Sequence, residues 1–129
     1  MTDTSTTTEL ETTIDTYVSS WNETDPTGRA ALVAAVWSAE GRHLDPLGDV
    51  TGHDGIDAHL AGVQEHYPDH RVERTSAVDT HHVRFRFTWR FVAPDGSVVV
   101  TATDVGELDP AGRIHRVDCF FGDPAPLPE

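Results

Sequence analysis

The hydrophobic pattern of this chain changes its period once, near Arg71, and this change constrains the fold more than any other feature. Before Arg71, apolar residues recur every three or four positions, as on amphipathic helices. After Arg71 they alternate with polar residues, as on strands with one buried face. Helices followed by consecutive strands are typical of an α+β domain. We therefore expect three N-terminal helices packed on one face of a curved antiparallel sheet.

The length of the chain fits one domain. A chain of 129 residues can bury a core of its own, and we assign residues 1–129 to a single domain. Residues 1–8 are rich in Thr and Ser, and residues 123–129 are rich in Pro, so both ends are expected to be flexible tails.

The charge of the chain limits its partners. It has 22 acidic residues against nine basic ones, all of them Arg, for a formal net charge of −13. Such a chain repels phosphate backbones and anionic lipid, so we expect no nucleic-acid and no membrane partner. The lone Cys119 rules out an intrachain disulfide and is compatible with a reducing cytosol, which predicts a cytoplasmic protein.

Three segments before Arg71 carry an apolar stripe at helical spacing. The first spans residues 8–22 and the third about 54–67; the second begins with Asp25 as N-cap and Pro26 at the first helical position, and continues to near Gly41. The inward residues of the three helices are Leu10, Ile14, Tyr17, Val18 and Trp21, then Leu32, Val33, Val36 and Trp37, then Ile56, His59, Leu60, Val63 and Tyr67.

The strands are predicted from alternation and from turn residues. Asp45 should end a short strand, because Pro46 pushes the residue before it toward an extended conformation. Longer strands are expected at residues 71–79, 83–92, 98–108 and 113–121. On the second of these, Phe87, Trp89 and Phe91 share one face, and the other face carries Arg84, Arg86 and Arg90.

Asp104 is a carboxylate on an otherwise apolar strand face. Its neighbours on that face are small or aliphatic, including Ala102 and Gly106. A buried carboxylate without a partner is costly, and the usual relief is a raised pKa or a strong hydrogen bond. The alternative is a strand near the sheet edge, where Asp104 reaches water.

Several motifs together resemble the nuclear transport factor 2-like superfamily, close to its SnoaL-like and ketosteroid isomerase branches. The residues that carry the resemblance are Tyr17-Val18 and Trp21-Asn22, Asp45-Pro46-Leu47-Gly48, Gly52 with Ile56, Asp104, and Phe120-Phe121-Gly122. The resemblance implies a cone-shaped fold that encloses a deep apolar pocket, and a homodimer formed through the convex side of the sheet. It also implies that no cofactor is needed.

The resemblance further implies a catalytic trio. In ketosteroid isomerases the general base is the Asp of an Asp-Pro-x-Gly loop, which Asp45 matches. The two oxyanion donors correspond to Tyr17 on the first helix and to a protonated Asp104. Each residue also has a purely structural alternative: Asp45 as the cap of the turn at Pro46, and Tyr17 as a core tyrosine.

The expected ligand pocket combines the inward faces of helices and strands. His59 shares the stripe of the third helix and could contact a ligand or be a satisfied core histidine. Cys119 shares the parity of Val117 and is expected to be a small buried residue rather than a nucleophile. The residues expected to line the pocket are Trp21, His59, Val63, Phe87, Trp89, Phe91 and Cys119.

No metal site is predicted. His66 and His70 are separated by Pro68, which breaks the helical face that an i, i+4 pair needs. His81 and His82 are adjacent on a strand and point to opposite faces.

Two functions remain open at this level. The first is a cofactor-independent isomerase or cyclase that transfers a proton α to a carbonyl, with Asp45 as base and Tyr17 and Asp104 as oxyanion donors. The second is a non-catalytic binding module for an apolar small molecule, held mainly by aromatic side chains. The first function requires the Asp45 and Asp104 carboxyls and the Tyr17 hydroxyl to converge on one cavity, and it fails if they do not.

Overall fold

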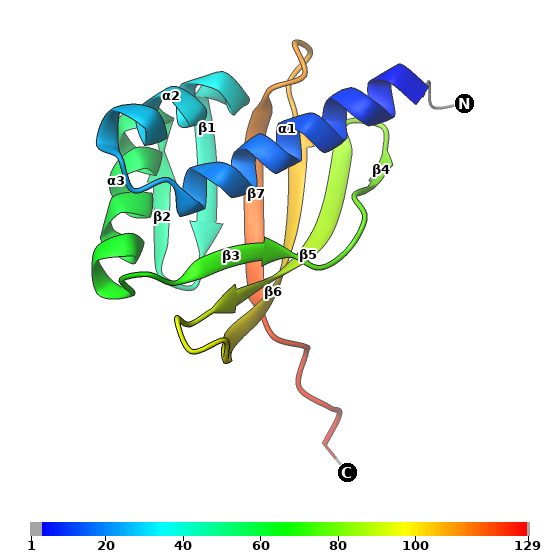
Figure 1. Cartoon of the computed structure of the whole chain (residues 1–129). Helices are drawn as coiled ribbons and strands as arrows, with labels where there is room; N and C mark the ends of the chain where they lie inside the picture. Colours follow the sequence, from blue (N-terminus) through cyan, green and yellow to red (C-terminus); the bar gives the residue numbers. More distant parts are fainter. Residues whose placement is uncertain (1–3, 129) are drawn as a thin grey trace.

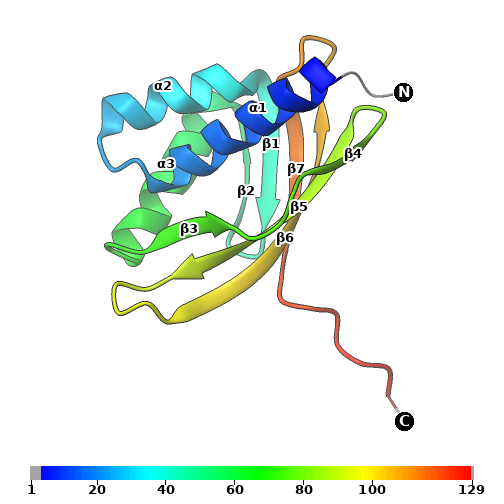
Figure 2. The ribbon, with the colours of Figure 1, turned by 45° about the vertical axis from the view of Figure 1, so that its right-hand side comes forward.

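A layer of three helices covers the concave face of a curved, open sheet (Figures 1 and 2). The computed structural model describes residues 4–128. The helices are α1 (Thr4–Asn22), α2 (Pro26–Val36) and α3 (Gly52–His66). The strands are β1 (Trp37–Asp45), β2 (Gly48–Thr51), β3 (Arg71–Arg74), β4 (Asp79–His81), β5 (Arg84–Val92), β6 (Val98–Leu108) and β7 (Ile114–Phe121). The predicted α+β arrangement is confirmed.

The sheet is mixed rather than purely antiparallel, which corrects the prediction. Its strand order is β2-β1-β7-β6-β5-β3, with β4 paired to β5. All neighbours are antiparallel except β1 and β7, which run parallel. From β1 the chain runs through β2, α3 and strands β3 to β6 before β7 pairs with the other side of β1. A long connection of this kind permits the parallel pairing.

The second helix is shorter than predicted, and β1 begins earlier. Trp37 was expected on the helix, but its backbone is extended (φ −92°, ψ 141°) and it opens β1. The pairing of β1 with β7 shifts register between Trp37 and Arg42, where the strand bulges. A Cβ at Gly41 would lie 2.4 Å from Cε3 of Trp37, so the glycine lets the indole lie against the strand. Buried packing of Trp37 therefore overrides its helical spacing.

Two other boundaries differ from the predictions. The expected strand at 71–79 is two short strands, β3 and β4, with irregular chain between them. Helix α1 begins at Thr4, so residues 4–8 are helical rather than a tail, and residues 1–3 lie outside the described residues. Residues 123–128 carry no regular structure.

The core lies between the helix layer and the concave face of the sheet. Ile14 and Tyr17 of α1 are buried there, as predicted. The predicted parity of β6 is also confirmed, because Ala102 and Asp104 are 4% and 1% exposed on the face toward the helices. None of the helices among residues 4–128 is long and apolar enough to cross a membrane.

A close contact between Gly106 and Phe85 predicts the effect of one substitution. A Cβ at Gly106 would lie 2.1 Å from Cζ of Phe85, a buried ring. Gly106→Ala should therefore overpack the core and lower the free energy of unfolding by about 1–3 kcal/mol. The measurement is urea unfolding followed by tryptophan fluorescence.

Gly62→Ala is the matched control, because Gly62 is exposed on α3 and an added Cβ meets nothing within 4 Å. It should stabilise the protein by about 0.5–1 kcal/mol through helix propensity. Equal effects of the two substitutions would contradict the packing described for Phe85.

Candidate functional site

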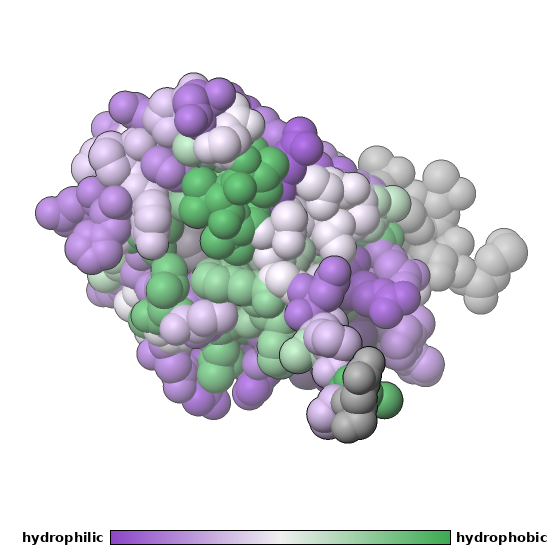
Figure 3. All heavy atoms as spheres, turned by 90° about the horizontal axis from the view of Figure 1, so that it is seen from below, coloured by the Kyte–Doolittle hydropathy of each residue, from purple (hydrophilic) through white to green (hydrophobic). Residues whose placement is uncertain are grey.

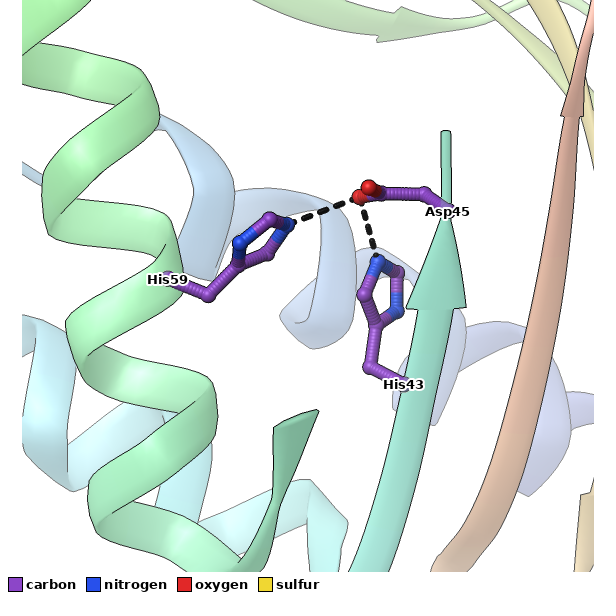
Figure 4. A group of neighbouring side chains, drawn as sticks. All are labelled: His43, Asp45 and His59. Atoms are coloured by element: carbon purple, nitrogen blue, oxygen red, sulfur yellow. Dashed lines mark hydrogen bonds and ion pairs between the residues drawn. The ribbon is translucent and has the colours of Figure 1, made fainter. Parts of the chain in front are cut away.

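The Asp45 carboxylate lies between two histidine rings at the end of β1 (Figure 4). Its Oδ2 atom is 2.8 Å from Nε2 of His43 and 2.8 Å from Nε2 of His59. Its Oδ1 atom accepts a hydrogen bond of 2.7 Å from the backbone N–H of Leu47. Asp45 thus caps the turn at Pro46, the structural alternative considered above, and also forms a buried His–Asp–His cluster.

The local sequence explains how the cluster forms. His43 and Asp45 are two residues apart on one strand, so their side chains share a face. His59 comes from α3, which packs against β1 and β2 (Figure 4). A Cβ at Gly48 would lie 2.9 Å from Cε1 of His59, so the glycine after Pro46 and Leu47 makes room for that ring. His43 was missed by the sequence analysis, although its i, i+2 spacing from Asp45 could have indicated it.

The environment of Asp45 favours its ionised form. The side chain is 5% exposed, and burial alone would raise its pKa. The hydrogen bonds from His43 and His59, with their electrostatic attraction, outweigh burial and hold the pKa well below the usual range. An ionised carboxylate only accepts hydrogen bonds, so both histidines carry a proton on Nε2.

The same three side chains offer nitrogen and oxygen atoms within 4.8 Å of one another, a possible ligand set for a metal ion. A histidine that binds a metal almost always donates its other ring N–H to an acceptor. Nδ1 of His43 is buried with no hydrogen-bond partner among the described residues. This arrangement fits a hydrogen-bonded cluster better than a metal site, and the absence of a metal stays a prediction.

A second buried cluster surrounds Asp104. The Tyr17 hydroxyl donates to Oδ2 at 2.8 Å, and the Trp89 indole N–H donates to Oδ1 at 3.0 Å. Burial raises the pKa of Asp104, against the opposing effect of the hydrogen bonds from Trp89 and Tyr17. Burial also raises the pKa of Tyr17, and the nearby Asp104 adds to that shift. Cys119 pairs with Asp104 across the sheet, and burial raises the pKa of its thiol.

An apolar pocket opens at the end of the molecule where β1, α3 and the β5–β6 hairpin meet. Apolar side chains gather in the middle of this face, with hydrophilic ones around them (Figure 3). The pocket has a volume of about 80 Å³. Its lining residues are Trp21, Asp45, Leu47, Val63, Tyr67, Val72, Trp89, Phe91, Val99, Val100 and Phe121.

The structure distributes the predicted site residues over three places. Of the seven residues expected to line the pocket, Trp21, Val63, Trp89 and Phe91 do so. His59 lies beside Asp45, and Phe87 and Cys119 are buried in the core.

Of the predicted catalytic trio, only Asp45 lines this pocket. Tyr17 and Asp104 contact each other and lie behind the wall that Trp89 forms. The catalytic roles of all three stay predictions.

Folding should shift the pKa values of Asp45 and Asp104 in opposite directions, so their contributions to stability should depend on pH in opposite ways. Because folding raises the pKa of Asp104, its contribution to stability should fall as pH rises from its unfolded pKa, about 3.9, to its folded pKa, and level off above that. Folding lowers the pKa of Asp45, so its contribution should be present above about pH 3.9 and be lost as pH falls.

Carbon-13 NMR of the side-chain carboxyls, assigned with Asp45→Asn and Asp104→Asn, measures both pKa values. A titration of Asp104 at or below the reference pKa would contradict the rise in its pKa that burial causes. A titration of Asp45 above the reference would contradict its stabilisation by the two histidines.

The sequence profile of the SnoaL-like domain matches residues 14–117. No curated protein matches the sequence. A proposed isomerase of the SnoaL-like family from Agrobacterium tumefaciens strain C58 is 35% identical, with 90% of this chain and 99% of that chain covered and a TM-score of 0.85.

Two more distant structures share the fold. A proposed SnoaL-like polyketide cyclase from Jannaschia sp. CCS1 is 18% identical, covers 87% of each chain and has a TM-score of 0.65. A protein with a ketosteroid isomerase-like fold from Catenulispora acidiphila DSM 44928, solved in complex with trimethylamine, is 14% identical over 86% of this chain and 84% of that chain, with a TM-score of 0.68. The match of the domain profile over residues 14–117, with the 35% identical relative, shows that the chain belongs to the SnoaL-like domain family.

Proposed function

We propose that the protein transfers a proton within a small carbonyl-containing molecule, with Asp45 as the group that contacts the substrate. One observation carries this proposal: an ionised carboxylate, 5% exposed, lies in the wall of an otherwise apolar pocket. Water is largely excluded there, so the charge acts on a bound molecule more strongly than it would in solution. The family membership supports a reaction of the isomerase or cyclase kind.

The low pKa of Asp45 favours an isomerisation over a net deprotonation. A carboxylate held by two imidazole N–H groups is a weak base, so it removes a proton from carbon only when the substrate makes that proton acidic. Once protonated, Asp45 is a strong acid and returns the proton readily to another carbon of the enolate. The bond broken and the bond formed are both C–H, and no cofactor takes part.

The oxyanion donors are the second part of the proposal. A neutral Asp104 can donate its proton to the Tyr17 oxygen, which frees the Tyr17 hydroxyl hydrogen for the enolate oxygen. Both groups lie behind Trp89, whose indole N–H is bonded to Asp104. Their action on a substrate therefore requires Trp89 to move when the substrate binds.

A non-catalytic binding module is the second candidate, and one observation favours it. With Tyr17 and Asp104 behind the wall, Asp45 carries the only charge among the lining residues, and its carboxylate is an acceptor rather than a donor. In this case the aromatic wall provides most of the binding free energy, and Asp45 only orients the ligand.

Hydrogen–deuterium exchange of α-protons separates the two candidates. Small cyclic ketones in deuterated buffer are incubated with the protein, and the loss of the α-proton signal is followed by NMR. The protein should accelerate this loss, and Asp45→Asn should reduce the acceleration by about 10²–10⁴-fold, because the base is gone.

Asp123→Asn is the matched control, since it removes an equal charge from an exposed position outside the pocket. It should leave the exchange rate unchanged. Ketones that bind but do not exchange, or an Asp45→Asn variant that exchanges as fast as the parent, would favour the binding module.

We also propose that the protein is a homodimer through the outer face of the sheet. Phe120 of β7 is 68% exposed on that face. Arg84, Arg86 and Arg90 lie on the same side and are paired within the chain to Glu107, Asp79 and Glu73. Paired charges on the same face as an exposed aromatic ring suit an interface better than free charges do.

Light scattering at micromolar concentration should therefore give the mass of two chains, and Phe120→Asp should shift the protein to a monomer. Phe120 points away from the core, so circular dichroism should show an unchanged fold. A monomeric parent protein would remove this proposal.

A further inference from the structure

Nearly half of the residues in the pocket wall are aromatic. Five of its eleven lining residues are aromatic, and they come from α1, the end of α3, β5 and β7: Trp21, Tyr67, Trp89, Phe91 and Phe121. The rings pack edge to face in pairs, Tyr67 on Phe91 at 5.6 Å and Trp89 on Phe121 at 6.3 Å between centroids. Such packing fixes the orientation of the rings around the pocket.

Much of the wall consists of the faces and edges of aromatic rings. The indole N–H of Trp89 is used by Asp104, so it is not free for a ligand. An anion would gain little from such a wall. A cation gains from the negative faces of aromatic rings.

The one charge in the wall is negative and has no fixed positive partner. The side-chain partners of Asp45 are His43 and His59, not Lys or Arg. The nearest arginine in sequence, Arg42, points away from this cluster and pairs with Asp49. A carboxylate among aromatic rings therefore gives the pocket a negative potential, which the acidic net charge of the protein strengthens.

We propose that the pocket binds a small alkylated ammonium group. The alkyl groups would pack against the rings, and the positive charge would lie between the aromatic faces and the Asp45 carboxylate. The pocket volume of about 80 Å³ suits a head group of this size, and it is far below the roughly 300–1,000 Å³ of pockets for larger ligands. An ammonium with several free N–H bonds would need more acceptors than the wall provides, because Asp45 carries its only carboxylate, so alkylation matters as much as charge.

This inference rests on the pocket being the ligand site of the proposed function, but not on proton transfer. It assigns the substrate or ligand a cationic group, which neither the isomerase nor the binding-module proposal specifies. A catalyst and a binding protein would recognise that group in the same way.

The experiment compares choline with 3,3-dimethyl-1-butanol, in which a carbon atom replaces the charged nitrogen. Each is titrated into the protein, and the indole N–H signals of Trp21 and Trp89 are followed by NMR. Choline should shift these signals and bind at least about tenfold more tightly than its neutral analogue. Ethanolamine, which keeps the charge but lacks the methyl groups, should bind more weakly than choline.

Two variants test separately the contribution of the carboxylate and that of the aromatic rings to ligand binding. Asp45→Asn keeps the shape but removes the charge, so it should abolish the preference for choline, whereas Asp123→Asn should preserve it. Phe91→Leu keeps an apolar wall but removes an aromatic ring, so it should weaken the binding of choline more than the binding of the neutral analogue. The comparison of choline with its neutral analogue on the parent protein needs no variant. It therefore remains valid even if one of the variants fails to fold.

The outcomes separate this inference from the proposed function. Equal or tighter binding of the neutral analogue would overturn the cationic preference and leave the pocket as a ligand site. Binding of neither molecule to the pocket would overturn the inference as well. Proton transfer is decided separately by the ketone exchange, which requires no cation.

Discussion

The pocket end of this protein depends on the hydrogen bonds that Asp45 accepts. The carboxylate joins His43 of β1, His59 of α3 and the backbone of the turn before β2. These elements come from different parts of the fold, and a single buried charge fixes their relative positions. Because an unpaired buried carboxylate would be costly, each of these bonds is needed to keep the charge in place. The functional carboxylate and the structural cap are therefore the same group.

The two buried carboxyls show how environment sets chemistry. Asp45 has two imidazole N–H donors and opens to the pocket, so it is held as an anion. Asp104 has one hydroxyl and one indole donor, is 1% exposed, and burial raises its pKa. Identical side chains thus take opposite protonation tendencies within one protein. Trp89 connects them, since its indole N–H binds Asp104 while the residue forms part of the wall beside Asp45.

The pocket combines features that the fold itself does not require. A curved sheet covered by helices needs an apolar interior, and Phe85 and Phe87 provide it deeper in the core. The aromatic rings at the open end, by contrast, remain partly accessible around one charge. Surface of this kind costs stability through incomplete burial, which is typical of a site kept for binding.

The sequence by itself determined much of the fold. The change of hydrophobic period near Arg71 predicted the helix and strand layers, and alternation along residues 98–108 placed Asp104 on the buried face. The Asp-Pro-x-Gly motif placed Asp45 at a strand end. These features are local, because they follow from the two- and 3.6-residue periods and from the restriction that Pro imposes on the residue before it.

Only the tertiary structure decided which strands pair and which buried side chains contact one another. Three features depend on long-range packing: the parallel pairing of β1 with β7, the early start of β1 at Trp37, and the contact of His59 on α3 with Asp45. The same holds for Tyr17, which was predicted to face the pocket but donates to Asp104 behind Trp89. The period of the hydrophobic pattern shows which face of a helix or strand is buried. Which residues that face contacts depends on how the helix layer packs on the sheet, and no local sequence pattern encodes this packing.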